Sequence, residues 1–170
     1  MATSGFNLSS APQPSISDVV EQKLRAERVV KSGAGWFITI AALSAVNSIL
    51  NMSSAQFHFI FGLGITEVVD AIAKGVTNGG IVLDLIINGF IAGIFVLFWH
   101  FARKAQAWAF WVGMIVYALD GVIVLLFKDY LSAAFHAYAL FRIYGGLSGI
   151  SVLREAEAAA LPAGAAIEPQ

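Results

Sequence analysis

The sequence predicts an all-α, polytopic membrane protein built around a bundle of four transmembrane helices, residues 34–153. The chain of 170 residues is 58% hydrophobic and only 12% charged, whereas soluble domains carry about 25% charged residues. A chain this short cannot bury so much apolar surface in one water-soluble core. Four long apolar segments, and an uneven distribution of Lys and Arg around them, are the other two observations behind this fold class.

The composition also limits the chemistry and the partners of the protein. The chain contains no cysteine, which excludes disulfides, thiolate catalysis and cysteine-ligated metal sites. Its formal net charge is −1, so it lacks the basic surface that nucleic acid requires. We therefore expect the lipid bilayer as a partner and no nucleic acid.

The first expected element is a short charged helix before the first span. Residues 1–16 are rich in Ser and Pro, and we expect them to form a disordered arm. Residues 17–32 are typical of a helix that lies on the membrane surface, with Ser17 as its N-cap and Gly33 and Gly35 ending it. A solvated helical linker explains the same residues equally well.

A transmembrane helix needs about 20 mostly apolar residues, and four segments of the chain meet this requirement. Tryptophan residues lie near one end of these segments, where indole rings favour the membrane interface. The expected spans are residues 35–52, 80–101, 107–127 and 131–150.

Residues 57–74, between the first two spans, predict a different kind of helix. Its apolar side chains follow helical spacing on one face, while Glu67 and Asp70 lie on another. Gly62 and Gly64 interrupt the apolar run. We expect an amphipathic or re-entrant helix on the outer side of the bundle.

The distribution of basic residues predicts the orientation. With four spans and a cytoplasmic N-terminus, both termini are cytoplasmic, and residues 154–170 form a disordered cytoplasmic tail. If residues 57–74 also crossed the membrane, Arg103 and Lys104 would lie outside, against the positive-inside rule. In the four-span topology, the basic residues on the cytoplasmic side are Lys23, Arg25, Arg28, Lys31, Arg103, Lys104 and Arg154.

Several polar residues interrupt the spans, mostly in their outer halves. An ionisable group at the bilayer centre costs about 2.5–3.5 kcal/mol, so it usually faces the bundle interior with a partner. We expect Asp120 to be buried against another helix, within reach of Asn47, Asn51, Asp84 or His136. Such groups can form a proton or ion pathway, or they can satisfy one another and hold the helices in register. The candidate cluster is Asn47, Asp84, Asn88, Asp120, His136 and the deeper Arg142.

Catalytic and metal-binding patterns are weak. His100 and His136 belong to opposite ends of the bundle, which disfavours a bis-histidine haem, and neither HExxH nor GxSxG occurs in the chain. We expect no metal site, no cofactor and no enzymatic activity.

Glycine pairs predict close helix packing. Gly89 and Gly93 form one GxxxG pattern, and Gly145 and Gly149 form another. Gly89 and Gly93 lie on the helix face opposite Asp84. One face would then serve the interior of the bundle, and the other a homo-oligomer or other membrane subunits.

Three stretches carry a resemblance to known proteins: FGLGITEVVDAIA, WAFWVGMIVYALDGVIVLL and FHAYALFRIYGGL. Over about residues 35–147 the chain resembles a group of uncharacterised small bacterial four-span inner-membrane proteins. The resemblance implies a bacterial inner (cytoplasmic) membrane protein and implies no particular activity.

Two functions agree with these features. The first is a non-enzymatic structural or accessory subunit, which acts through helix packing in a homo-oligomer or a larger membrane complex. The alternative is a small proton, ion or solute transporter that uses the polar cluster in the outer half of the membrane.

Overall fold

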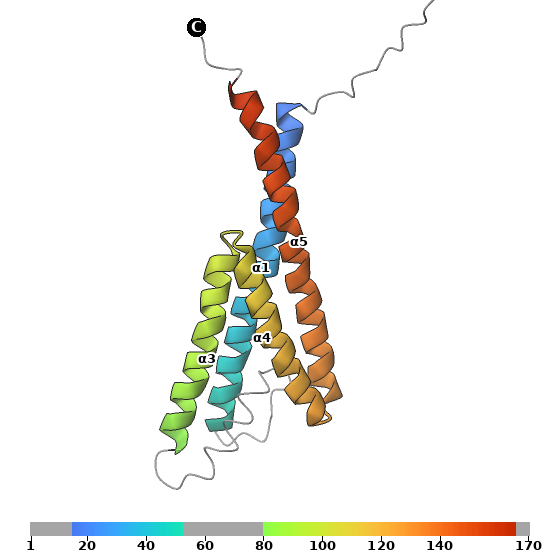
Figure 1. Ribbon diagram of the computed structural model, residues 1–170. Helices are drawn as coiled ribbons and strands as arrows, with labels where there is room; N and C mark the ends of the chain where they lie inside the picture. The colour runs from blue at the N-terminus through green and yellow to red at the C-terminus, as the bar shows by residue number, and fades with distance from the viewer. Residues whose placement is uncertain (1–14, 53–79, 166–170) are drawn as a thin grey trace, which may run out of the picture.

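The computed structural model describes residues 15–52 and 80–165, and within these ranges the protein is all-α, as predicted. Figure 1 shows the helices as antiparallel neighbours in an up-and-down bundle. Helix α1 packs against α3 and α5, and α4 packs against the same two helices. The helices are α1 (Ile16–Met52), α3 (Gly80–Ala102), α4 (Ala107–Leu126) and α5 (Tyr130–Ala165).

Three of these helices, α1, α3 and α4, are long and apolar enough to cross a membrane. Helix α5 is longer than α3 and α4, but His136 and Arg142 interrupt its apolar half, and Glu155 and Glu157 lie further along it. The expected amphipathic helix at residues 57–74, including Glu67 and Asp70, lies outside the described residues.

Short turns explain the antiparallel order of α3, α4 and α5. Between α3 and α4, Ala105 has a φ of 56°, and its N–H donates to the carbonyl of Ala102 at 2.9 Å. Between α4 and α5, Lys128 has a φ of 62°, and its N–H donates to the carbonyl of Leu125 at 3.0 Å. Both residues adopt the left-handed conformation that reverses a chain in few residues.

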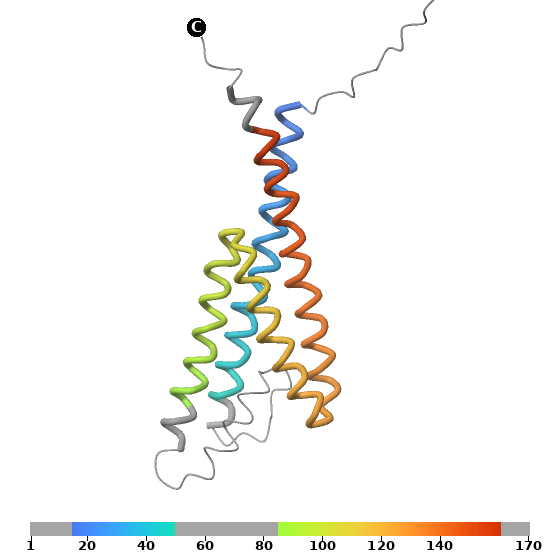
Figure 2. Tube along the Cα trace, in the orientation of Figure 1, coloured from blue at the N-terminus to red at the C-terminus, as the bar shows by residue number. Residues whose placement is uncertain are grey.

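Helices α1 and α5 extend together beyond the α3–α4 turn and form a two-helix stalk (Figures 1 and 2). We use the name stalk for residues 16–30 and 149–160. At 1.5 Å per residue, the α1 part of the stalk is about 22 Å long. Small and apolar side chains fill the stalk interface: Val19, Ala26 and Val30 from α1, and Ile150, Leu153 and Ala156 from α5.

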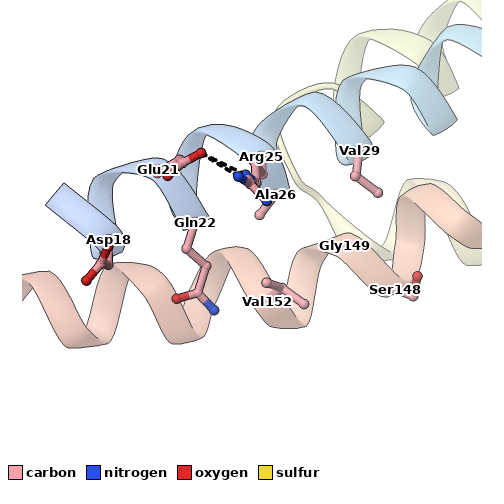
Figure 3. Close-up of a pocket in the computed structure, with 9 residues that line it drawn as sticks. All are labelled: Asp18, Glu21, Gln22, Arg25, Ala26, Val29, Ser148, Gly149 and Val152. Atoms are coloured by element: carbon pink, nitrogen blue, oxygen red, sulfur yellow. Dashed lines mark hydrogen bonds and ion pairs between the residues drawn. The ribbon is translucent and has the colours of Figure 1, made fainter. Parts of the chain in front are cut away.

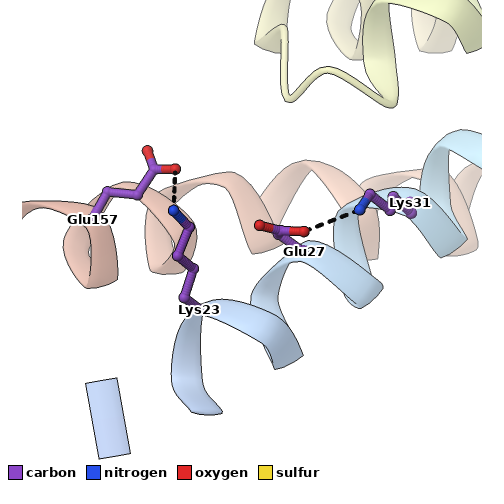
Figure 4. A network of polar contacts seen from close by, with 4 residues as sticks. All are labelled: Lys23, Glu27, Lys31 and Glu157. Atoms are coloured by element: carbon purple, nitrogen blue, oxygen red, sulfur yellow. Dashed lines mark hydrogen bonds and ion pairs between the residues drawn. The ribbon is translucent and has the colours of Figure 1, made fainter. Parts of the chain in front are cut away.

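Two ion pairs lie on the surface of α1 and α5 at the stalk (Figure 4). Lys23 on α1 lies 3.4 Å from Glu157 on α5. Lys31 donates to Glu27 at 3.0 Å within α1, and this hydrogen bond lowers the pKa of Glu27. These pairs are partly exposed, so each contributes little to stability, about 0–1 kcal/mol. The apolar interface is the main source of stalk stability.

Helix α1 begins two residues earlier than a cap at Ser17 would place it. The Oγ atom of Ser15 accepts a hydrogen bond from the N–H of Asp18 at 3.2 Å and donates to its carboxylate at 2.6 Å. The N–H of Ser15 also donates to that carboxylate, at 3.1 Å. This reciprocal arrangement is a capping box. Because it stabilises the charged form, it lowers the pKa of Asp18.

Gly33 and Gly35 do not end a helix, and the expected surface helix and first span form one continuous helix, α1. The reason is tertiary packing: α1 crosses α5 where Gly33 meets Gly146. A β-carbon on Gly33 would collide with the Cα and N atoms of Gly146, and a β-carbon on Gly146 would collide with Gly33 in turn. Two glycines therefore let the backbones touch.

The C-terminal segment also differs from the expected tail. Helix α5 continues to Ala165, although residues 154–170 were expected to be disordered. Leu153 and Ala156 are buried against α1, so packing in the stalk gives this part of α5 a reason to stay helical.

An aromatic layer fills the bundle below the α3–α4 turn. The rings of Phe37, Phe95, Phe98 and Phe110 are buried, and the centroid of Phe37 lies 5.8 Å from that of Phe98 and 6.0 Å from that of Phe110. Gly113 makes room for this layer, because a β-carbon there would lie 2.5 Å from Phe37. The half of the bundle nearest the stalk is thus solidly packed.

The Gly33–Gly146 crossing predicts the effect of a single methyl group. We expect Gly33→Ala to lower the free energy of unfolding by about 1–3 kcal/mol, because the backbones must separate. Gly35→Ala is the matched control: its β-carbon meets no atom within 4 Å, so it should be neutral or add up to about 1 kcal/mol through helix propensity. Equilibrium unfolding in detergent measures both, and equal effects would contradict the prediction.

Candidate functional site

The candidate site is a buried pair formed by Asp120 of α4 and His136 of α5, in the half of the bundle away from the stalk. The Nε2 atom of His136 lies 2.8 Å from Oδ2 of Asp120. The two residues are 2% and 4% exposed. The expectation that Asp120 is buried against another helix with a polar partner is therefore confirmed, and His136 is that partner.

The second nitrogen of His136 determines how many protons the pair holds. Its Nδ1 atom lies 2.7 Å from the carbonyl oxygen of Ser132, and a carbonyl only accepts, so Nδ1 carries a proton. A neutral imidazole would then offer only a lone pair at Nε2, which cannot bond to a carboxylate. One further proton must lie between Nε2 and Asp120. The pair is net neutral, either as imidazolium and carboxylate or as imidazole and carboxylic acid.

Tyr117 and Gly121 shape the space around His136. Tyr117, one turn before Asp120 on α4, stacks on the His136 ring with centroids 4.4 Å apart and an interplanar angle of 17°. Tyr117 also meets Phe95 of α3 edge-on at 6.0 Å, which joins the pair to the aromatic layer. A β-carbon on Gly121 would lie 3.2 Å from the Cβ of His136, so this glycine lets α5 approach.

The start of α5 holds the carbonyl that His136 uses. Asp129 precedes the helix, and its Oδ1 atom accepts a hydrogen bond from the N–H of Ser132 at 3.1 Å. An Asp before the first turn satisfies an N–H group that has no partner within the helix. The cap therefore orders the turn whose Ser132 carbonyl binds Nδ1.

Other polar residues of the predicted cluster are also buried in the bundle. Asn47 and Asn88 are buried, on α1 and α3. Ser44, Ser48 and Ser132 are buried too, and none of the three belonged to the predicted cluster. The signal for the first two was the spacing of Ser44, which lies three residues before Asn47 and four before Ser48. The side chain of Asp84 lies outside the described residues.

Arg142 does not join the cluster. It is exposed on the bundle surface, with its guanidinium carbon 5.9 Å from the ring centroid of Trp36. Six residues separate it from His136, which is about 9 Å along the helix axis.

The predicted packing glycines behave differently from one another. Gly149 lies close to α1, where a β-carbon would be 2.9 Å from Cγ1 of Val29. Gly89, Gly93 and Gly145 face open space, because a β-carbon on any of them would meet no described atom within 4 Å. Within the described part of the chain, the glycines that do bring helices together include Gly33, Gly146 and Gly113.

Asp120 also reaches the surface of the bundle. It lines a groove of about 260 Å³ between α3 and α4, whose other walls are apolar. The groove residues besides Asp120 are Ile91, Ile94, Phe95, Val116, Leu119 and Ile123.

Metal chemistry gains no support from the part of the chain that the structure describes, since no three His, Asp or Glu side chains gather there. No family model matches the chain, and neither a curated protein nor a solved structure is detectably similar to it. The resemblance to small bacterial inner-membrane proteins therefore stays an expectation.

The hydrogen bonds of the pair predict which substitutions it tolerates. Asp120→Ala leaves Nε2 of His136 buried without a partner, so we expect it to lower the free energy of unfolding by about 1–3 kcal/mol. Asp120→Asn should cost less than about 1 kcal/mol, because an amide N–H can donate to neutral Nε2. Unfolding in detergent compares the two.

A double-mutant cycle with His136→Ala isolates the contact itself. We expect a coupling energy of about 0.6–1.7 kcal/mol, the range found for hydrogen bonds between membrane helices. The exposed Leu119→Ala is the control and should show no coupling to His136→Ala. An Asp120→Asn variant as unstable as Asp120→Ala would contradict the assigned proton.

Proposed function

We propose that the protein is a non-enzymatic integral membrane protein that acts as a structural or accessory subunit through its outer helix faces. The observation that carries this proposal is the internal hydrogen bonding of His136, which uses both ring nitrogens inside the bundle. Groups bonded in this way hold α4 and α5 in register. The aromatic layer beside them fills the space that a continuous water pathway would need.

The architecture within this proposal has four spans. Helix α4 is 20 residues long, about 30 Å, which matches the hydrocarbon core of a bilayer. Helix α5 follows it after a short turn and packs against it, so it returns through the same layer. His136 lowers the hydropathy of α5, but its ring is buried on Asp120 and does not meet lipid.

The orientation follows from the basic residues. The stalk and the α3–α4 turn lie at one end of the molecule (Figure 1) and carry Lys23, Arg25, Arg28, Lys31, Arg103, Lys104 and Arg154. Among the described residues, Lys128 is the single basic residue at the opposite turn, between α4 and α5. The positive-inside rule then places the stalk in the cytoplasm, and the resemblance favours a bacterial inner membrane.

Cysteine labelling tests this topology in a chain that has no cysteine of its own. We expect Arg103→Cys, at the α3–α4 turn, to react with an impermeant maleimide only after the cells are opened. Lys128→Cys, at the α4–α5 turn, should react in intact cells. The reverse pattern, or both residues reacting from one side, would contradict four spans with a cytoplasmic stalk.

The face offered to a partner runs along α3. Ile86, Phe90 and Leu97 are 63%, 71% and 57% exposed, and they share one helical stripe with Gly89 and Gly93. Glycine in a helix costs up to about 1 kcal/mol relative to alanine, and these two glycines make no compensating contact in the described bundle. A close-packed helix from a second copy or another subunit would supply that contact.

Bulk at these glycines should disrupt an assembly. We expect Gly89→Leu with Gly93→Leu to reduce the mass of the purified protein in detergent, measured by light scattering, to that of a single chain. The control is the double variant Ala134→Leu with Ala137→Leu, which adds side-chain bulk to an exposed face of α5. It should leave the mass unchanged. An assembly that tolerates both pairs equally would remove α3 as the interface.

A transporter is the second candidate, because Asp120 both holds a proton with His136 and lines the α3–α4 groove. Asp120→Asn separates the two roles. A structural role predicts the same proton leak for wild-type and Asp120→Asn protein in liposomes under a pH gradient, followed with a pH-sensitive dye. A faster flux for wild type alone would favour transport, since an amide neither takes up nor releases a proton.

A further inference from the structure

Two pockets that share Val29 and Ser148 form a groove along one side of α1 and α5, and the groove changes character along its length. Its stalk end, about 470 Å³, is lined by charged and polar residues that include Asp18, Glu21 and Arg25 (Figure 3). Its other end, about 630 Å³, is lined by Arg28 and Arg142 with Ser32, Tyr144 and Phe141. We call the whole feature the α1–α5 groove.

The stalk end of the groove has more carboxylates than basic groups, whereas the charged residues of the other end are all basic. Figure 3 shows Arg25 paired with Glu21, and Asp18 adds a further carboxylate beside them. No carboxylate lines the end that holds Arg28 and Arg142. Neither arginine forms an ion pair with any residue of the described ranges. This end therefore carries a net positive charge.

The position of Arg142 sets how far this end of the groove extends below the stalk side of the bundle. A β-carbon on Gly146 would lie 2.9 Å from Phe110, which belongs to the first turn of α4. Arg142 is one turn further from the stalk, about 6 Å. Side chains tilt toward the N-terminus of their helix, and for α5 that direction leads deeper into the bundle. An arginine at this depth is costly without a partner, and Trp36 supplies only a weak one.

We propose that the α1–α5 groove binds the phosphate of an anionic phospholipid from the leaflet on the stalk side. Arg28 and Arg142 flank the phosphate, and the hydroxyl groups of Ser32 and Tyr144 donate to its oxygens. Phe141, at the deep end, lies beside an acyl chain. This inference rests on the four-span architecture proposed above and adds a ligand to it.

Two other occupants fit the groove less well. A second copy of the chain has no carboxylate to offer at this depth in the described ranges. Asp84, near the start of α3, and Asp129 lie toward the end of the bundle opposite the stalk, and Asp120 is buried on His136. The other carboxylates of these ranges lie on the stalk. A free anion would need no apolar wall. Phe141 and Tyr144, however, flank the arginines and are 72% and 56% exposed, as expected for side chains that meet acyl chains.

Lipid retention by the purified full-length protein tests the proposal. Native mass spectrometry compares binding of phosphatidylglycerol with that of phosphatidylcholine, and adds inorganic phosphate as a competitor. We expect phosphatidylglycerol to bind in preference. Arg28→Gln and Arg142→Gln should each weaken its binding about fivefold, the effect of one arginine at an anionic membrane surface. Arg142→Lys, which keeps the charge, should weaken it less.

Arg103 supplies the matched control. Its guanidinium carbon lies 4.8 Å from the ring centroid of Trp99, much as Arg142 lies over Trp36, but it does not line the groove. Arg103→Gln should leave binding of phosphatidylglycerol unchanged.

Three results would overturn the lipid site. They are equal binding of the two lipids, displacement of phosphatidylglycerol by equimolar phosphate, and equal losses for Arg103→Gln and Arg142→Gln. Cysteine labelling separates the two proposals. If labelling supports four spans and lipid binding fails, only the groove inference falls; if labelling fails, both fall.

Discussion

The structure depends on the contact between the backbones of Gly33 and Gly146. Because neither residue has a side chain, α1 and α5 cross at van der Waals distance, and Phe110 of α4 closes over Gly146. The crossing fixes three things at once. It directs the stalk away from the bundle, sets the depth of the aromatic layer, and opens the groove that Arg28 and Arg142 line. Larger residues at the crossing would separate the helices on which all three depend.

The buried pair of Asp120 and His136 fixes one register of α4 against α5, among several that apolar packing alone would allow. Leucine and isoleucine faces pack in many registers, but Asp120 reaches His136 in only one. The cap at Asp129, the Ser132 carbonyl, the Tyr117 ring and Gly121 all serve the same histidine. Since the pair is net neutral, it provides this selectivity without placing a net charge in a low-dielectric interior.

Sequence reasoning reached those features that depend on local periodicity. Apolar runs located α3 and α4 almost to the residue, and the cost of a charge in lipid was enough to predict that Asp120 is buried with a partner. Periodicity defines a helix face, however, without saying which neighbour the face meets. His136 was therefore one of several possible partners, and Arg142, placed in the same cluster, lies on the outer surface instead.

The remaining differences arise where tertiary contacts reverse a local preference. A glycine read alone weakens a helix, yet Gly33 stabilises this one by admitting α5. Likewise, the Ala-rich segment after Arg154 looks featureless in isolation, although Leu153 and Ala156 are packed against α1. Information of this kind lies in the pairing of distant residues.

The unbroken course of α1 has a mechanical consequence. About 26 Å of the helix lies on one side of the Gly33–Gly146 crossing and about 28 Å on the other, with no loop between them to absorb a displacement. Helix α1 can therefore pivot as a rigid body about the crossing. A partner that tilts the stalk at the membrane surface would move the opposite end of α1, and with it the buried face that carries Ser44, Asn47 and Ser48, by a comparable distance in the opposite direction.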